Sequence, residues 1–248
     1  MKTLHLILFL VLNLTLAAQT AENTLRALVM PKNIEHIIAM ETKLAEHYTM
    51  PAPKDSSWFE YRSGSNKVLI TAGHATAHLR EGKVKRADGG TGSLGMELHK
   101  LRDVPLFFTK YQSPSDPNYY DANAFKDSLA VIIRQVHPTI VIDLHCSHPY
   151  RPFDIDFGTM NGESCLTRMD LLDSLKTALH REGLINQSQD YFAAAKHHTI
   201  TKFVVREGVP CIQMEINANY ISPALGNGNG QKTARLLQAL LRFIDGVN

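Results

Sequence analysis

The sequence predicts an α/β fold: a single three-layer domain in which a mixed, mostly parallel sheet has helices on both faces. Segments typical of strands alternate with segments typical of helices, which is the pattern of a sheet built through helical connections. The strand segments are apolar at consecutive positions, as expected for strands that are buried on both faces. With 248 residues and 44% hydrophobic residues, the chain is sized for one core.

Hydrophobic periodicity gives the order of the elements. Helices are expected from residue 33 to near Pro51 and at 91–102, 122–135, 169–182, 199–207 and 232–243. Strands are expected within 58–62, 67–72, 104–109, 139–145, 154–159 and 209–217, the first two joined by a Gly-Ser turn. No internal repeat or Pro/Gly-rich linker divides the sequence, which supports a single domain.

The N-terminus differs from the rest of the chain. Lys2 precedes an apolar run at 6–16 and two alanines, an order typical of a secretory signal peptide. The run is short for a membrane span, and the alternatives are a short membrane anchor or a buried helix. We expect residues 1–21 to be a signal peptide and residues 22–248 to form the domain. The mature protein is then secreted or periplasmic, with no membrane association.

The charge of the sequence bears on its possible partners, and its cysteine content bears on disulfide bonding. The formal net charge is +2 and both signs are mixed along the chain, so no nucleic-acid partner is predicted. Three cysteines give no disulfide framework. Cys211 is expected to be a buried small hydrophobe. Cys146 is expected to pack or to support the site from beside it, rather than to act as a nucleophile. The composition does not predict an oligomeric state.

Three predicted strands end on side chains that suit a metal site: His74, His145 and Glu215. In α/β sheets, ligands bind beyond the carboxyl ends of the strands, so we expect these side chains to lie together. Two imidazoles and a carboxylate suit zinc, which takes nitrogen and oxygen ligands. Each residue also has an ordinary alternative, such as a turn cap for His74 or a buried ion pair for Glu215.

Other polar residues lie close to these three in the sequence. Asp143 points to the same side of its strand as His145, because side chains alternate along a strand. It is expected either to orient that imidazole or to bond to a neighbouring backbone amide. Four further histidines are predicted to be polar loop or helix-start residues: His78, His148, His197 and His198.

Three blocks occur in order, at 73–95, 142–162 and 206–217: GHATAHLREGKVKRADGGTGSLG, IDLHCSHPYRPFDIDFGTMNG and REGVPCIQMEIN. Together they resemble the N-formylglutamate amidohydrolase family, which is itself similar in fold to the zinc carboxypeptidases and aspartoacylases. The resemblance that the blocks carry extends from about Val68 to Ile216. The resemblance implies a zinc-carboxypeptidase-like (phosphorylase/hydrolase-like) fold. It also implies one zinc ion per chain and metal-dependent hydrolysis of a C–N bond.

The resemblance further implies a role for each site residue. His74 is similar to the first zinc ligand and His145 to the ligand from the later strand. Glu215 resembles the catalytic carboxylate that activates water. Carboxypeptidase-like sites place an acid shortly after the first histidine, but Ala77 occupies that position here. The second ligand is therefore displaced, and Asp88 in KRADGGTG is the residue that we assign to it.

The assignment of Asp88 leaves alternatives open. Glu81 and His78 are the other candidates for the second ligand. Asp88 is equally suited to cap the helix expected at 91–102.

Arg151 and Lys126 are candidates for binding a substrate carboxylate. A guanidinium binds a carboxylate through two hydrogen bonds and a lysine as a point charge. Formylglutamate-cleaving members of the family carry an Asn-Arg pair in roughly this region, and this sequence has none there. Export also does not fit an enzyme of histidine breakdown, so formylglutamate is not the expected substrate.

The sequence therefore predicts an exported zinc-dependent amidohydrolase. Its substrate is expected to be a small N-acyl amino acid or a peptide that carries a carboxylate. The alternatives are a metallocarboxypeptidase-like enzyme acting on peptides and a non-catalytic relative that only binds its ligand.

Overall fold

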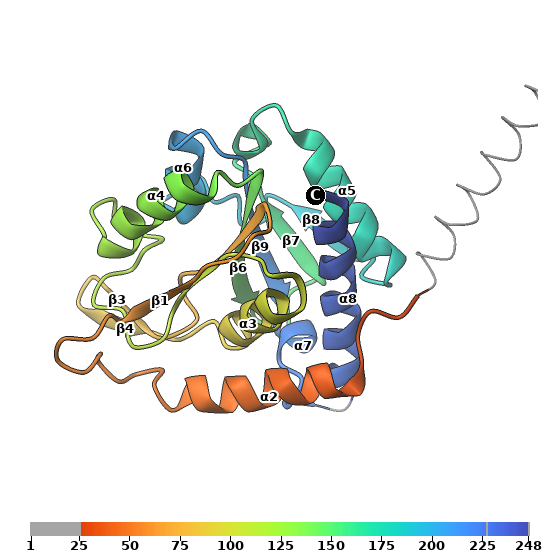
Figure 1. The fold of residues 1–248 in the computed structure, drawn as a ribbon, viewed down its shortest axis with the longest axis horizontal. Helices are drawn as coiled ribbons and strands as arrows, with labels where there is room; N and C mark the ends of the chain where they lie inside the picture. The colour runs from red at the N-terminus through yellow and green to blue at the C-terminus, as the bar shows by residue number, and fades with distance from the viewer. Residues whose placement is uncertain (1–25, 227, 248) are drawn as a thin grey trace, which may run out of the picture.

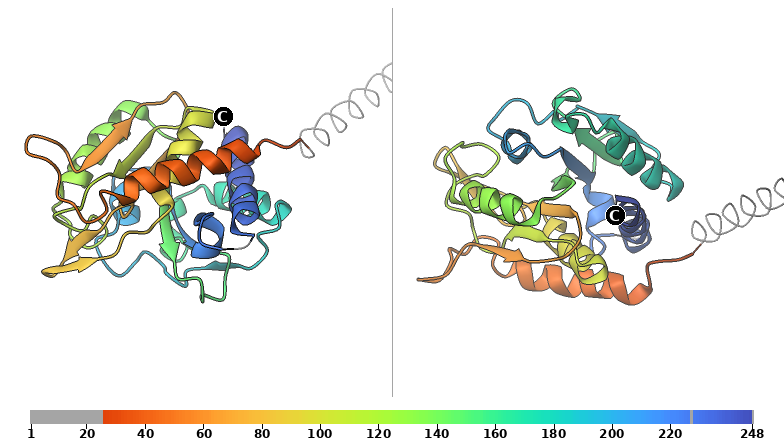
Figure 2. Two further views of the ribbon diagram at one scale, coloured as in Figure 1. Left: turned by 90° about the horizontal axis from the view of Figure 1, so that it is seen from below. Right: turned by 45° about the horizontal axis from the view of Figure 1, so that its top comes forward.

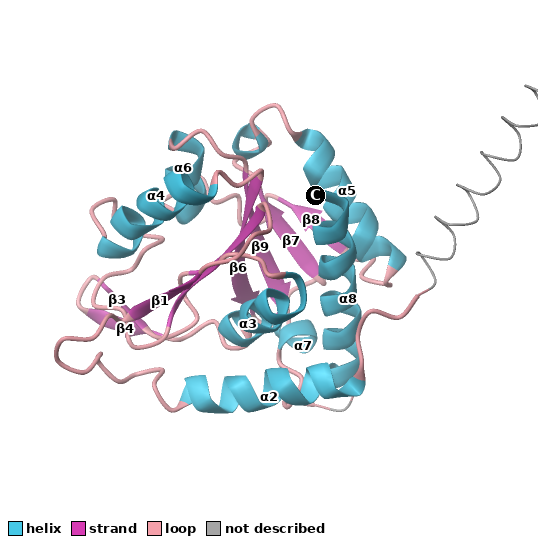
Figure 3. Cartoon of the chain, viewed as in Figure 1, coloured by secondary structure: helices cyan, strands magenta, loops and turns pink. Residues whose placement is uncertain are grey.

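A seven-stranded sheet runs through the centre of the molecule, as the computed structural model shows (Figures 1 and 3). The structure describes residues 26–226 and 228–247, so the signal peptide predicted at 1–21 lies outside the described residues. Within the described part, no helix combines the length and apolar character needed to cross a membrane.

The strands of this sheet lie in the order β1-β5-β2-β6-β9-β7-β8. Their bounds are β1 Phe59–Arg62, β2 Val68–Ala72, β5 Leu106–Thr109, β6 Ile140–Ser147, β7 Ile155–Gly158, β8 Gln187–Gln189 and β9 Cys211–Asn217. The four central strands β5, β2, β6 and β9 are parallel. β1 and β7 pair antiparallel with β5 and β9, and β8 is parallel to β7. The predicted mixed, mostly parallel sheet is confirmed.

Helices cover both faces of the sheet (Figures 1 and 2). One face packs against α2 Pro31–Ala45, α3 Thr91–Arg102, α5 Met169–Arg181, α7 Ala218–Ile221 and α8 Asn229–Val247. The other face packs against α4 Ala124–Val136 and α6 Ile200–Arg206. The predicted three layers are therefore present.

On the α4/α6 face of the sheet, the side chains of two neighbouring strands change from apolar to polar along the strand. In β6, Val141 packs in the core beneath α4 and α6, and Asp143 and His145 follow on the same side. In β9, Cys211 has the place of Val141 and is followed by Gln213 and Glu215. This face is thus apolar at the start of the two strands and polar at their carboxyl ends.

The predicted helices and strands all occur, with shifts of a few residues at their ends. The largest shift is at the helix predicted from 33 to near Pro51, which begins at Pro31 and ends at Ala45. The sequence did not indicate the hairpin of β3 (His78–Arg80) and β4 (Lys83–Lys85), the strand β8, the helix α7 or the 3₁₀ turn at Glu163–Cys165. All are four residues or shorter, too short for periodicity to reveal.

Candidate metal centre

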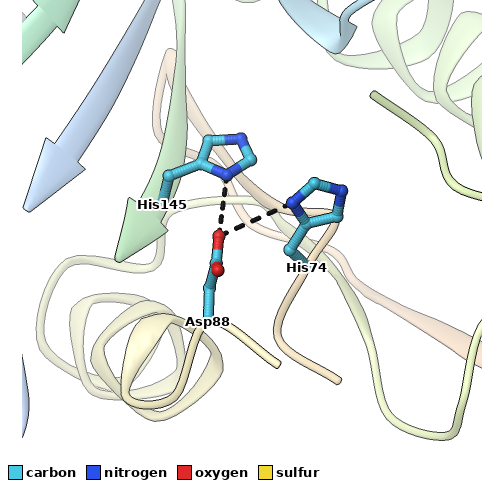
Figure 4. Close-up of side chains that lie close together, drawn as sticks. All are labelled: His74, Asp88 and His145. Carbon is cyan, nitrogen blue, oxygen red and sulfur yellow. Dashed lines mark hydrogen bonds and ion pairs between the residues drawn. The ribbon is translucent and has the colours of Figure 1, made fainter. Parts of the chain in front are cut away.

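Two histidines and an aspartate meet at the carboxyl ends of β2 and β6 (Figure 4). His74 follows β2, Asp88 lies in the loop before α3, and His145 lies within β6. One potential ligand atom from each residue lies within 4.8 Å of the others. Asp88 Oδ2 lies 2.8 Å from His145 Nδ1 and 3.5 Å from His74 Nδ1. Both imidazoles therefore turn the same ring nitrogen towards one carboxylate.

Each imidazole also contacts a fully buried carboxylate through its other ring nitrogen, Nε2. His74 Nε2 lies 2.8 Å from Asp116 Oδ1, and His145 Nε2 lies 3.1 Å from Asp143 Oδ2. A carboxylate at Nε2 favours the proton on that nitrogen and leaves Nδ1 free to bind a metal. Of the two predicted roles for Asp143, the structure shows the one in which it orients His145.

The electrostatics of the group favour protonated histidines and an ionised Asp88. Burial lowers the pKa of His145, but Asp143 and Asp88 outweigh burial and hold that pKa well above its ordinary value. The pKa of His74 is also raised, because Asp116 and Asp88 outweigh the effect of burial. Burial raises the pKa of Asp88, but the two imidazoles outweigh it and hold that pKa below its ordinary value. A cation at the Nδ1 atoms would take the place of protons.

Two glycines let the loops that carry His74 and Asp88 pack closely against neighbouring helices. A Cβ on Gly73 would lie 2.6 Å from a side-chain carbon of α6. Gly90 has φ 90°, and its Cβ would lie 2.4 Å from a carbonyl oxygen of α7. Asp88 N donates to His74 O at 2.8 Å. The N-cap of α3 is Gly90 and no side chain caps it, so the alternative in which Asp88 caps this helix is wrong.

His74 also belongs to a second candidate group, with His78 and Asp116. The rings of His74 and His78 stack with centroids 3.8 Å apart, and His78 Nε2 lies 3.3 Å from Asp116 Oδ2. Arg80 Nε donates to the same oxygen at 2.5 Å. This guanidinium neutralises Asp116 and repels a cation, so the group with Asp88 is the better metal site. His78 is buried at the start of β3, which corrects its prediction as a polar loop residue.

Glu215 lies beside the His/Asp group, on the neighbouring strand. It is directly opposite His145 in the pairing of β6 with β9. Burial raises the pKa of Glu215 to about 7, although His145 acts in the opposite direction. Gln213 Nε2 donates to Glu215 Oε1 at 3.0 Å. A carboxyl group with a pKa near neutrality is suited to accept a proton and to return it.

A cavity of about 690 Å³ opens over these residues, a size typical of small-molecule sites. Its walls include the metal-site residues, Glu215, Arg80 and the segment 191–197. Cys146 also lines it, but burial raises the pKa of the thiol well above its ordinary value. The thiol is therefore a poor nucleophile, which agrees with the prediction that Cys146 has another role.

Comparison with family models and with curated protein sequences finds no match. Solved structures, in contrast, match in fold. The N-formylglutamate amidohydrolase from Ralstonia eutropha JMP134 aligns with a TM-score of 0.54 at 12% sequence identity, over 76% of this chain and 96% of that chain. The chain has the fold of an N-formylglutamate amidohydrolase. The fold implied by the three sequence blocks is thereby confirmed.

Two other solved structures match with lower TM-scores. A bacteriophage poly-gamma-glutamate hydrolase aligns at TM-score 0.47 and 14% identity, over 79% of this chain and 94% of that chain. A metallo-carboxypeptidase from Pseudomonas aeruginosa aligns at TM-score 0.48 and 10% identity, over 76% of this chain. The alignment spans 60% of that carboxypeptidase chain. All three matched proteins bear the names of hydrolytic enzymes.

The structure does not bring Lys126 to the site. Its side chain is fully buried, and its Nζ donates to Tyr120 O at 2.7 Å and also to His198 O. Burial lowers the pKa of Lys126 to about 8. Lys126 is therefore a structural residue that joins two loops, rather than the substrate contact that the sequence predicts.

Arg151 and Glu81 both lie outside the His/Asp group. Arg151 is exposed, donates to Tyr191 OH at 3.1 Å and stacks over Phe192, and both aromatic residues line the cavity. It stays a predicted substrate contact, placed at the rim. Glu81 is exposed and accepts a hydrogen bond from Tyr119 OH at 2.5 Å. The structure thus places Asp88, and not Glu81, beside the two histidines.

Sequence reasoning missed Asp116, Asn118 and Arg80. Asp116 holds His74, and Asn118 lies beside His145, with 3.2 Å between Asn118 Nδ2 and His145 Nε2. Both residues stand in the stretch SPSDPN after β5, which has the composition of an ordinary turn. Arg80 lies in the unpredicted hairpin. Nothing local in the sequence distinguished these residues from loop residues.

Proposed function

We propose that the chain is an exported zinc-dependent amidohydrolase that cleaves the C–N bond of a small N-acyl amino acid or a peptide. The observation that carries this proposal is the orientation of His74 and His145. Buried aspartates hold both Nε2 atoms, so that both Nδ1 atoms face Asp88. The shared fold with an amidohydrolase supports the same class of reaction. Export rests on the predicted signal at 1–21.

His74, Asp88 and His145 fit a zinc ion. Two ligands of tetrahedral zinc, bonded at about 2.0–2.1 Å, are roughly 3.3 Å apart. The separations of 2.8 and 3.5 Å between Asp88 Oδ2 and the two Nδ1 atoms lie on either side of that value. Three protein ligands are also the number found in open, catalytic zinc sites. When bound, zinc polarises an amide carbonyl and lowers the pKa of water.

Glu215 has the position and the pKa of a general base. Its carboxylate takes a proton from water while the water oxygen adds to the amide carbon. The C–N bond then breaks, and Glu215 returns the proton to the leaving nitrogen, which yields a carboxylic acid and an amine. The hydrogen bond from Gln213 to Oε1 restrains the carboxyl group beside His145 during both steps.

A hydrolysis assay with the mature, zinc-loaded protein tests the proposed function. The panel should contain N-formyl and N-acetyl amino acids and peptides with free or blocked C-termini. We expect zinc-dependent release of a free amine from at least one of these classes. Cleavage only of peptides with a free C-terminus would indicate a carboxypeptidase. A protein that holds zinc and binds members of the panel without cleaving any would be a non-catalytic binding protein, which contradicts the proposal.

The rate should fall on the acid side with the titration of Glu215. The general base must be ionised, and burial raises its pKa to about 7. A bound cation favours the ionised carboxylate, so the acid limb of kcat/KM should lie at or below pH 7. Below it, kcat/KM should drop about tenfold per pH unit. An acid limb of kcat/KM that is unchanged in Glu215→Gln would contradict this role for Glu215.

Replacing Asp143 with asparagine should weaken zinc binding by about 10- to 100-fold. The charge of Asp143 holds the proton on His145 Nε2 and so keeps Nδ1 free. Zinc dissociation constants measured by competition with a chelator check this expectation. Asp173→Asn, a change at an exposed position of α5, is the matched control. Equal zinc affinity in Asp143→Asn and the wild type would show that the contact is not needed.

A further inference from the structure

Arg80 is a cationic side chain in the wall of the cavity, and the proposed reaction assigns it no role. Its Nε donates to Asp116 Oδ2 at 2.5 Å, and its Cζ lies 5.1 Å from the centroid of the Tyr119 ring. These two contacts hold the guanidinium in place. Among the described residues, none accepts a hydrogen bond from Arg80 Nη1 or Nη2. The two terminal nitrogens are therefore available to a ligand.

Asp116 connects this guanidinium to the metal centre. One carboxylate oxygen accepts from Arg80 and the other faces His74 Nε2 at 2.8 Å. Arg80 is thus separated from the first predicted metal ligand by a single, fully buried carboxylate. A ligand held by Arg80 would lie in the same cavity as an amide bond placed at the metal centre.

The other cations considered for substrate binding are less suited to the interior of the cavity. Lys126 is buried against two backbone carbonyls, and Arg151 lies against Tyr191 and Phe192 at the rim. Lys196 lines the cavity but is exposed. Arg80 alone of these four combines a place in the wall with an anchored and partly buried guanidinium.

We propose that Arg80 binds a carboxylate of the substrate and selects substrates that carry one near the scissile amide. This inference rests on the proposed function for the location of the scissile bond. A guanidinium binds a carboxylate through two parallel N–H···O bonds, here from Nη1 and Nη2. Asp116 fixes the fork in advance, so that little side-chain freedom is lost on binding.

Binding of glutarate and of its diamide, which has no carboxylate, tests the proposal without any need for turnover. Isothermal titration should use the zinc-loaded wild type, Arg80→Lys and Arg80→Gln. A lysine at position 80 has one nitrogen, which Asp116 occupies, so it should preserve the metal centre while lacking the fork. We expect the wild type to prefer glutarate, and Arg80→Lys to bind it about tenfold more weakly or worse. Arg86→Gln, an exposed position in the same segment, should bind glutarate as the wild type does.

Zinc content and thermal melting of the same samples separate loss of the anion site from loss of the fold. Arg80→Lys that retains zinc and still binds glutarate like the wild type would overturn the proposal. A wild type with equal affinity for glutarate and its diamide would also overturn it. Failure of the proposed hydrolysis would not affect either measurement, because both report equilibrium binding.

Discussion

Glu215→Gln should reduce amide hydrolysis by about 10²- to 10⁴-fold, the range in which a general acid–base contributes. The amide of glutamine has almost the shape of the carboxyl group but neither accepts nor returns a proton near neutral pH. Glu215 is not a member of the His/Asp group, so zinc stoichiometry should stay at that of the wild type. Rates on the best substrate of the panel and elemental analysis of the same preparation give both quantities.

Glu81→Gln is the matched control for this variant. Glu81 is an exposed acid close in sequence to the site, and it belongs to neither candidate metal group. Its substitution should leave kcat and zinc content unchanged. A Glu215→Gln protein that holds zinc and hydrolyses amides at the wild-type rate would remove Glu215 from the mechanism. The same loss of rate in both variants would show that the effect is not specific to the general base.

The sequence predicts those parts of the site that belong to the strands. The apolar runs ending at His145 and Glu215 indicate strands buried on both faces, and the period of two places Asp143 on the side of His145. The structure shows that side-by-side placement, with His145 directly opposite Glu215. These relations depend on local pattern and on the parallel sheet, which are both properties that a sequence reveals.

The parts of the site that belong to loops are not predictable in this way. Asp88 followed from the family resemblance, since capping of the next helix explained it equally well by local rules. Asp116 and Arg80 reach the site through a loop and a short hairpin whose paths depend on tertiary packing. Lys126 was predicted to bind substrate and does not. The local sequence is the same for an exposed helical lysine and for one that is buried against two carbonyls.

His145→Ala and Asp88→Ala should each lose zinc, whereas His78→Gln should retain it. The first two substitutions remove a ligand from the group His74/Asp88/His145, and a site with two protein ligands holds zinc weakly. His78 belongs only to the second group, where Arg80 already neutralises Asp116. Elemental mass spectrometry of the mature proteins, after zinc loading and removal of free metal, should give about one zinc ion per chain for the wild type and His78→Gln.

The opposite result would place the ion elsewhere. Zinc retained in His145→Ala and Asp88→Ala but lost in His78→Gln would assign it to His74, His78 and Asp116. Glu215 would then no longer stand beside the metal, since its strand partner is His145. A wild type that takes up no zinc would contradict the proposed zinc-dependent mechanism of hydrolysis. The two groups share only His74, so variants at the unshared positions decide between them without relying on activity.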